Sequence, residues 1–184
     1  LDFGFYEPMS LGSQVWYDTN NDGLQGFNEA GIDGVSVSLY RDDNRDGLPD
    51  GSAIDSQITA GGGWYLFDNL AAGSYVVVVD AKNFLSSGVL SSTQSSTQTA
   101  LDPNVGGAGN KGVVADDNGI NTTNPMAEGV RSGTIDLYPN SEQVAEPVGA
   151  QGTGIADDDS SNLTVGFGFY EPLNLGNRVW HDLN

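Results

Sequence analysis

Apolar and β-branched residues alternate with polar ones in short runs along the chain, and turn-forming residues separate these runs. The period is close to two, which is typical of strands that bury one face, and 26 glycines oppose long helices. Six runs predict strands, and a weaker seventh joins them, at residues 11–16, 35–40, 64–70, 74–80, 134–138, 163–170 and 56–59. The expected fold class is therefore all-β, and the regular turn signals favour a β-sandwich.

Two connections between these strands are distinctive. The segment Ala71-Ala72-Gly73 is short, so we expect residues 61–70 and 74–80 to pair as a hairpin. In contrast, about 86–129 is a long insert without core-forming runs, rich first in Ser, Thr and Gln and then in Asn, Gly and Asp. Such an insert is disordered, functional, or ordered by bound metal.

A repeated motif occurs near both ends of the sequence. Residues 3–20 read FGFYEPMSLGSQVWYDTN, residues 167–184 read FGFYEPLNLGNRVWHDLN, and the two agree at 12 of 18 positions. A spacing of this kind is typical of a tandem array. We predict that residues 1–8 are the last strand of a preceding repeat, 9–171 one repeat, and 172–184 the first strand of the next. The end segments are expected to pair with neighbouring copies, head to tail.

The first acidic loop has the full calcium-loop spacing D-x-[DN]-x-[DN]-G-x5-E. A hard cation prefers oxygen ligands at alternate positions of a tightly turning loop, with a bidentate carboxylate closing the shell. Gly26 occupies position nine, where water is expected instead of a side chain. The predicted ligands are the side chains of Asp18, Asn20, Asp22 and Glu29 and the carbonyl oxygen of Leu24.

A second loop starts in the same way but lacks the closing glutamate, because position twelve is Ala53. A calcium site and a polar hairpin turn are both compatible with this pattern, and calcium is the favoured interpretation. Asp55 would have to reach in through a bulge to replace the missing carboxylate. The predicted ligands are Asp42, Asn44, Asp46, the carbonyl of Leu48, Asp50 and Asp55.

Two further acidic segments lack full loop spacing. Three adjacent carboxylates repel one another unless something neutralises them. The two segments are therefore expected either to come together around one ion, with Asp33 nearby, or to be two solvated turns. The candidate ligands are Asp116, Asp117, Asn118 and Ile120 in one segment and Asp157, Asp158 and Asp159 in the other.

Charge restricts the possible partners. The formal net charge of −19 argues against nucleic acid and anionic membrane surfaces, and 14 of the 25 acidic residues lie in the four loops just described. The sequence has no cysteine and no apolar run long enough to insert into a membrane. Millimolar calcium outside cells would fill weak loops, so we expect an extracellular or cell-surface location.

Catalysis has few candidate groups. His181 is the only histidine, which excludes a His-dependent triad in the repeat itself, and we expect no enzyme activity. A pair of carboxylates for glycoside hydrolysis stays open on composition alone, although calcium loops account for most of the acids.

Three stretches together resemble the SdrD-type B domain of bacterial cell-wall adhesins, a Cna-B-like repeat. They read LGSQVWYDTNNDGLQGFNEAGIDGVSVSLYRDDNRDG, GGGWYLFDNLAAGSYVVVV and NLTVGFGFYEP. The resemblance implies a transthyretin-like, Ig-type sandwich of about seven strands that binds several calcium ions and stands in series between cell wall and adhesive head. The isopeptide-bonded branch of Cna-B domains needs a lysine on the first strand, but the lysines here are Lys82 and Lys111. We therefore expect calcium, at two or more sites, to stiffen this repeat.

The function expected from the sequence is a calcium-rigidified structural repeat of an extracellular filament, stalk or surface adhesin. Its expected partners are neighbouring copies of the same repeat. Two alternatives stay open: a ligand-binding adhesin head that uses the insert, and an accessory module of a secreted hydrolase.

Overall fold

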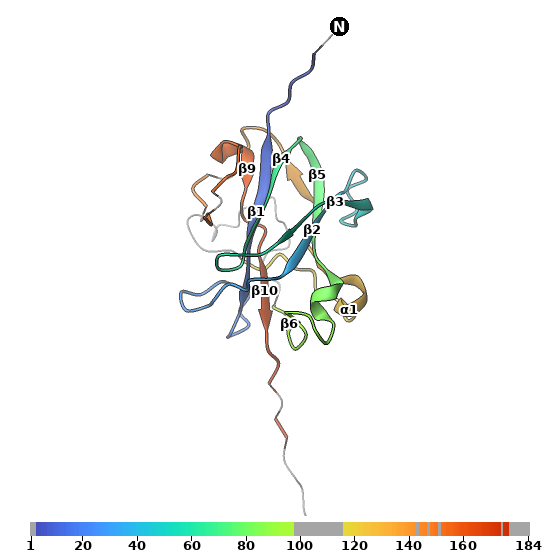
Figure 1. The fold of residues 1–184 in the computed structure, drawn as a ribbon, viewed down its shortest axis with the longest axis vertical. Helices are drawn as coiled ribbons and strands as arrows, with labels where there is room; N and C mark the ends of the chain where they lie inside the picture. The colour runs from blue at the N-terminus through green and yellow to red at the C-terminus, as the bar shows by residue number, and fades with distance from the viewer. Residues whose placement is uncertain are drawn as a thin grey trace, which may run out of the picture.

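Two β-sheets face each other in the computed structural model, which describes residues 3–97, 116–142, 144–146, 148–150, 152–173 and 175–176 (Figure 1). The first sheet contains β1 (Met9–Tyr17), β4 (Trp64–Leu70), β6 (Gln94–Ser95), β9 (Ser161–Asn162) and β10 (Phe167–Tyr170). The second contains β2 (Ser36–Arg41), β3 (Asp50–Ile58), β5 (Gly73–Val79), β7 (Val130–Arg131) and β8 (Ile135–Leu137). The helical pieces are η1 (Ala81–Phe84), α1 (Pro125–Glu128) and η2 (Asp158–Ser160).

One central strand organises each sheet. β1 pairs with antiparallel β4 on one side and with parallel β10 on the other, where Trp16 lies opposite Gly168. β9 adds a short parallel pairing at the start of β1, with Ser10 opposite Ser161. In the second sheet, β2 lies between the antiparallel strands β3 and β5.

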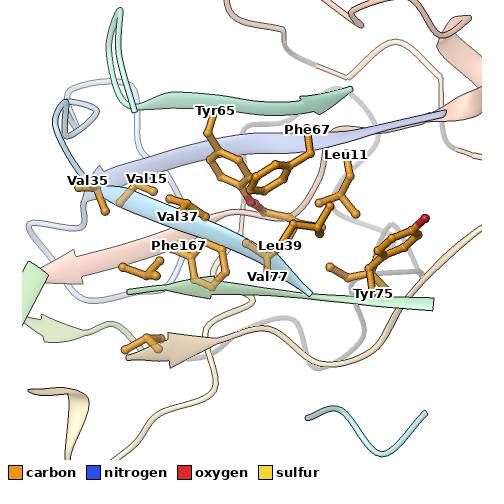
Figure 2. Close-up of a cluster of buried hydrophobic side chains, with 14 of the residues drawn as sticks. Leu11, Val15, Val35, Val37, Leu39, Tyr65, Phe67, Tyr75, Val77 and Phe167 are labelled. Carbon is orange, nitrogen blue, oxygen red and sulfur yellow. The ribbon is translucent and has the colours of Figure 1, made fainter. Parts of the chain in front are cut away.

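The core fills the space between the two sheets (Figure 2). Leu11 and Val15 from β1 are fully buried, and so are Val37 and Leu39 from β2. Tyr65 contributes its ring to the same layer and donates its hydroxyl hydrogen to the carbonyl oxygen of Val165. The alternating residues of the central strands therefore meet across the sandwich, as their period of two predicts.

The expected hairpin between residues 61–70 and 74–80 is wrong. Both segments are strands, β4 and β5, but β4 pairs with β1 and β5 pairs with β2, β7 and β8. The short link that contains Ala71 and Ala72 therefore crosses from one sheet to the other. Alternation identifies a strand and its buried face, but it does not identify the neighbouring strand.

The seven expected strands are all present, and the structure adds short ones. The weak run at 56–59 belongs to the nine-residue strand β3. Most side chains of β3 are exposed, so apolar and polar residues do not alternate clearly along it. The residues missed by periodicity form β6, β7 and β9, each two residues long. Two residues are too few for any period to be visible.

Both ends of the insert belong to the sandwich. Gln94 and Ser95 pair with the end of β10, and Asp117 forms an isolated bridge with Gly166. Residues 98–115 of the insert lie outside the described residues. The described part of the insert is therefore ordered against the sandwich, and Ile120 bridges Arg131 of β7 in the second sheet.

The chain enters and leaves at opposite ends of the sandwich, because β1 and β10 run parallel (Figure 1). Apolar residues just outside these strands are almost fully exposed: Phe3 79%, Phe5 95%, Leu173 97% and Leu175 103%. Their counterparts one repeat along the sequence are fully buried, namely Phe167, Phe169, Met9 and Leu11. Residues 1–2, 174 and 177–184 of the two end segments lie outside the described residues.

Candidate metal centre

The first loop directly follows β1 and folds around a buried carboxylate. Asp18 is fully buried, and its N–H donates to the carbonyl oxygen of Phe169 at 2.8 Å. Its Oδ1 accepts from the N–H of Asp22 at 3.2 Å, and its Oδ2 accepts from the N–H of Gly23 at 2.8 Å. Gly23 has φ 75°, a left-handed conformation that favours glycine. The loop therefore turns tightly around its first ligand position, as the sequence predicts.

Further polar contacts hold the next predicted ligands on the same loop. Asn20 donates from Nδ2 to Oδ2 of Asp22 at 2.8 Å, and Asp22 accepts at Oδ1 from the N–H of Leu24 at 2.9 Å. Glu29 returns to the start of the loop, where Oε1 accepts from the N–H of Thr19 at 2.6 Å. Its Oε2 accepts from the N–H of Gly26 at 2.8 Å. All five predicted ligand residues of the first loop thus belong to one compact turn.

The second loop, between β2 and β3, repeats this hydrogen-bond pattern. Asp42 is fully buried and accepts from the N–H groups of Asp46 and Gly47, both at 3.0 Å. Asn44 donates to Oδ2 of Asp46 at 3.1 Å, and Leu48 donates to its Oδ1 at 2.9 Å. Two segments with different flanking sequences therefore adopt the same hydrogen-bonded turn around a buried aspartate.

Asp50 contacts the start of the second loop, whereas the assignment of Asp55 as a ligand stays a prediction, because Asp55 lies beyond a register shift between Leu39 and Arg41. The Oδ2 atom of Asp50 accepts from the N–H of Asp43 at 2.8 Å, as Glu29 does at the corresponding residue of the first loop. Asp55 lies in β3 opposite Leu39, where it accepts hydrogen bonds from Ser56 and Gln57. Leu39 lies three positions before Asp42, which is about 10 Å at the rise of a strand.

We expect Asp50→Ala to weaken calcium binding at the second loop, because it removes the carboxylate that contacts the start of that loop. Asp55→Ala is the matched control, and it leaves calcium binding unchanged. Isothermal titration calorimetry of both variants distinguishes the two positions. Equal losses in both variants would contradict the assignment of Asp50.

The insert brings a third acidic segment against the first loop. Asp116 forms an isolated bridge with Leu24, and the N–H of Asp117 donates to the carbonyl oxygen of Gly23 at 2.8 Å. Asn118 accepts at Oδ1 from the N–H of Gly166 at 2.9 Å. The N–H of Ile120 donates to Arg131 at 2.7 Å, further along the same segment.

Asp117 has the most unusual environment of these residues. It is fully buried, and its Oδ1 accepts from the N–H groups of Gly119 at 3.0 Å and Gly168 at 3.1 Å. Its Oδ2 is buried and has no hydrogen-bond partner among the described residues. Burial raises the pKa of Asp117 to about 7, and the negative charges of Asp18 and Asp116 add to this rise. An orphaned carboxylate oxygen beside two other carboxylates fits a hard cation.

The remaining acidic segment is far from this centre, so the expectation that Asp157, Asp158 and Asp159 share an ion with Asp116 and Asp117 is wrong. They precede or begin η2, next to β9, and β9 pairs with the start of β1. Asp117 lies beside the other end of β1, near Asp18. From Ser10 to Asp18 the strand spans roughly 27 Å. The repeat topology therefore separates the two acidic clusters.

Asp33 also has a role different from the expected one. Its Oδ1 accepts from the N–H groups of Gly62 at 2.8 Å and Gly63 at 2.6 Å. These backbone hydrogen bonds, that of Gly63 first, lower the pKa of Asp33. Asp33 therefore orders the glycine turn before β4.

No three His, Asp or Glu side chains already converge on one point as a finished metal cage within the described part of the chain. Most of the loop oxygens accept hydrogen bonds from the N–H groups of their own loop, as described above. No described helix is long and apolar enough to cross a membrane.

Sequence reasoning missed Thr134 and Glu146. Thr134 donates from Oγ1 to Oδ2 of Asp42 at 2.6 Å, which ties the start of the second loop to the segment before β8. Glu146 is 7% exposed although it lies in an irregular segment. No local pattern marks either residue, since each acquires its role from a tertiary contact.

Comparison with known proteins identifies relatives over most of the chain. A family model described as SdrD B-like domain matches residues 9–124. Together with the two facing sheets, this match confirms the expected Cna-B-like β-sandwich.

Three relatives are informative. A fibrinogen-binding protein of Staphylococcus epidermidis is 48% identical over 82 residues, which are 44% of this chain and 7% of that protein. Serine-aspartate repeat-containing protein F of Staphylococcus epidermidis is 36% identical over 172 residues, 89% of this chain and 9% of that protein. Serine-aspartate repeat-containing protein C of Staphylococcus aureus is 39% identical over 104 residues, 55% of this chain and 10% of that protein. The chain thus spans a tenth or less of these relatives, and none of the three names denotes an enzyme.

Proposed function

Because the chain belongs to the SdrD B-like domain family, we propose that it is a structural repeat of a bacterial surface protein, stiffened by calcium and joined head to tail with further repeats. The chain is part of an extracellular, cell-surface protein, as membership of this family implies. The observation that carries the calcium proposal is the shared geometry of the two loops, each built around a fully buried aspartate.

Calcium supplies a compact positive charge that carboxylate and carbonyl oxygens can share. In the first loop, Asp18, Asn20, Asp22 and Glu29 would hold it, with Asp117 reaching in from the insert. This arrangement ties the end of β1 to the insert, whose Asp117 in turn contacts Gly168 of β10. In the second loop, the contact between Asp42 and Thr134 ties the β2–β3 connection to the segment before β8. Each site therefore fixes segments that are distant in sequence.

The direction of the strands suits a protein under tension. A force that stretches the repeat acts at the start of β1 and at the end of β10. These strands are parallel neighbours, with Val15 opposite Phe167 and Tyr17 opposite Phe169. The hydrogen bonds between them would therefore be loaded together in shear. The first loop lies at the end of β1 where β10 leaves the sandwich, so calcium there would reinforce this junction.

The exposed end segments support the head-to-tail arrangement. Phe3 and Phe5 correspond to Phe167 and Phe169, which belong to β10 and are fully buried in the sandwich. Exposure of these apolar side chains to water is unfavourable, and packing against a neighbouring repeat would bury them. The Glu7-Pro8 pair leaves little freedom between such repeats.

Calcium titration of this chain tests the proposal. We expect saturable binding in wild type and its loss from both loops in the double variant Asp18→Asn/Asp42→Asn. Asp43→Asn is the matched control, because Asp43 is exposed and pairs with Arg41 at 2.9 Å. Titrations that are identical for wild type and the double variant would contradict the proposal.

Ligand binding is the second candidate function, favoured by one pocket. A hollow of about 540 Å³ lies between the insert and the end of β10, lined among others by Thr93, Asn121, Met126 and Tyr170. This size is sufficient for a small ligand or a peptide side chain. The mixed lining does not select a ligand class, so the structural function remains the first proposal.

A further inference from the structure

The link between successive repeats is only two residues long when repeats follow one another head to tail. β10 ends at Tyr170, and the residue that corresponds to Met9, the start of β1, is Leu173 in the second copy of the motif. Glu171 and Pro172 alone therefore connect the two strands. Three residue steps span at most about 10 Å. The end of one sandwich and the start of the next must therefore lie against each other.

The segment before β1 shows how this link lies against the repeat that follows it. Residues 3–8 and residues 167–172 are identical, and both read FGFYEP. Tyr6 thus corresponds to the tyrosine that ends β10, and Glu7 and Pro8 correspond to the two-residue link. Pro8 is partly buried, and β1 begins at the next residue. The link therefore has no free length beyond these two residues.

Three side chains from separate segments of the repeat hold the link. Tyr6 donates its hydroxyl hydrogen to Oδ1 of Asn69, near the end of β4, at 3.0 Å. Glu7 accepts from Nδ2 of Asn140 at 3.1 Å and from Oγ of Ser160 in η2 at 3.1 Å. We call Asn69, Asn140 and Ser160 the entry surface. Contacts with three segments fix the orientation of the link, whereas a single contact would permit rotation.

The two asparagines of the entry surface have an unusual backbone conformation. Asn69 has φ 57° and Asn140 has φ 55°, which is the left-handed region that glycine adopts most readily. What asparagine adds to glycine at these positions is its side-chain amide, and in both residues the amide contacts the link.

The tyrosine at the end of β10 also has a contact within the repeat that it ends. Tyr170 donates its hydroxyl hydrogen to Oε1 of Gln94 in β6 at 2.9 Å. In an array, one hydroxyl group would therefore face Gln94 of its own repeat and Asn69 of the next. A tyrosine hydroxyl donates one hydrogen bond and accepts another, and a side-chain amide offers either an acceptor or a donor. Both contacts are thus chemically compatible.

We propose that the entry surface is the docking site for the end of the preceding repeat, and that it makes the junction a fixed joint instead of a flexible hinge. This inference rests on the head-to-tail arrangement proposed above. Exposed hydrogen bonds are individually weak, but a two-residue link keeps their partners close at a high effective concentration. The end segments leave the sandwich in opposite directions along its long axis, so a fixed joint gives an extended array (Figure 1).

A chain of two repeats tests the joint, with a second copy of residues 9–184 following Pro172 of this chain. The sequence has no cysteine, so Ala53→Cys in each repeat places one spin label per repeat at an exposed position of β3. Pulsed electron paramagnetic resonance then measures the distribution of distances between the two labels. We expect a single narrow distribution.

The variant Asn69→Gly/Asn140→Gly in the second repeat removes two side chains of the joint, while glycine retains the left-handed backbone. We expect the distribution of label distances to broaden. The matched control carries the same two substitutions in the first repeat, whose entry surface has no repeat before it. Its distribution is expected to stay narrow, although the substitutions affect the stability of a single repeat equally.

A second variant, Tyr170→Phe, removes only a hydroxyl group. In the first repeat, where this tyrosine precedes the link, we expect a broader distribution of label distances. In the second repeat the same substitution removes the contact with Gln94 alone, so the distribution is expected to stay narrow.

A broad distribution in the two-repeat chain without these substitutions would overturn the fixed joint. Equal distributions for substitutions in the first and in the second repeat would also overturn it. Nuclear magnetic resonance spectra of the same protein separate this failure from a failure of the proposed function. If only one of the two repeats folds, the head-to-tail arrangement itself is wrong; if both fold and the label distances vary widely, only the joint is wrong.

Discussion

Replacing Asp117 with asparagine is expected to stabilise the metal-free protein at about pH 7.5 and to remove much of the stabilisation that calcium provides. Asparagine keeps the Oδ1 atom that accepts from Gly119 and Gly168, but it removes a buried charge next to Asp18 and Asp116. The expected gain in the free energy of unfolding without metal is roughly 2–4 kcal/mol. Urea unfolding in EDTA and in calcium measures both effects.

The control for this prediction is Asp43→Asn, which removes an exposed carboxylate of the second loop without touching a buried position. It is expected to leave the metal-free stability within about 0.5 kcal/mol of wild type. A metal-free Asp117→Asn protein that is less stable than wild type would show that the charge of Asp117 is already compensated.

Metal-free wild type is expected to lose stability as the pH rises from about 4 to about 8, the reverse of what buried salt bridges produce. The ordinary pKa of aspartate is 3.8, and the pKa of Asp117 in the folded protein is about 7. The folded state therefore holds this proton more tightly than the unfolded state does. The stabilisation is fully present below pH 3.8 and is lost as the pH passes through about 7, at about 4 kcal/mol in total. Urea unfolding in EDTA across this pH range measures it.

Asp33 acts in the opposite direction, on the acidic side of this profile. Its pKa is lowered by the N–H groups of Gly63 and Gly62, so its contribution is present above pH 3.8 and disappears as the pH falls further. The profile in EDTA should therefore decline toward neutral pH, and Asp117→Asn should reduce that decline. The part that remains belongs to Glu146 and Glu142, because burial raises the pKa of each of these residues as well. A profile that rises steadily from pH 4 to 8 in both proteins would contradict the assignment of Asp117.

The sequence predicts the two loops well, because their chemistry is local. The first loop has every spacing that a calcium loop needs, and the structure places its predicted ligands on one turn. In the second loop position twelve lacks a carboxylate, so the sequence offers both Asp50, at position nine, and Asp55 as ligands. The structure shows that Asp50 makes the corresponding contact earlier in the loop, because the chain enters β3 directly after it.

Tertiary contacts are what the sequence does not show. The parallel pairing of β1 with β10 joins Trp16 to Gly168, and alternation along either strand gives no sign of it. Asp117 and Asp158 lie near opposite ends of β1, because Asp117 contacts Gly23 after β1, whereas Asp158 precedes β9, which pairs with the start of β1. Both residues lie in acidic runs that look equivalent in the sequence. In the sequence, Glu146 cannot be told from an exposed acidic residue, and only its burial in the structure distinguishes it.

The most direct test of calcium stiffening is the melting temperature of this chain in about 2 mM calcium and in excess EDTA, with magnesium as the control for ion specificity. If a loop binds with a dissociation constant of roughly 10 μM, calcium stabilises the folded form by about 3 kcal/mol. For a domain of this size, that stabilisation raises the melting temperature by roughly 6–12 °C. We expect a rise of this order with calcium and a much smaller one with magnesium. Equal melting temperatures in calcium and EDTA would contradict a structural role for the metal and leave the acidic loops as solvated turns.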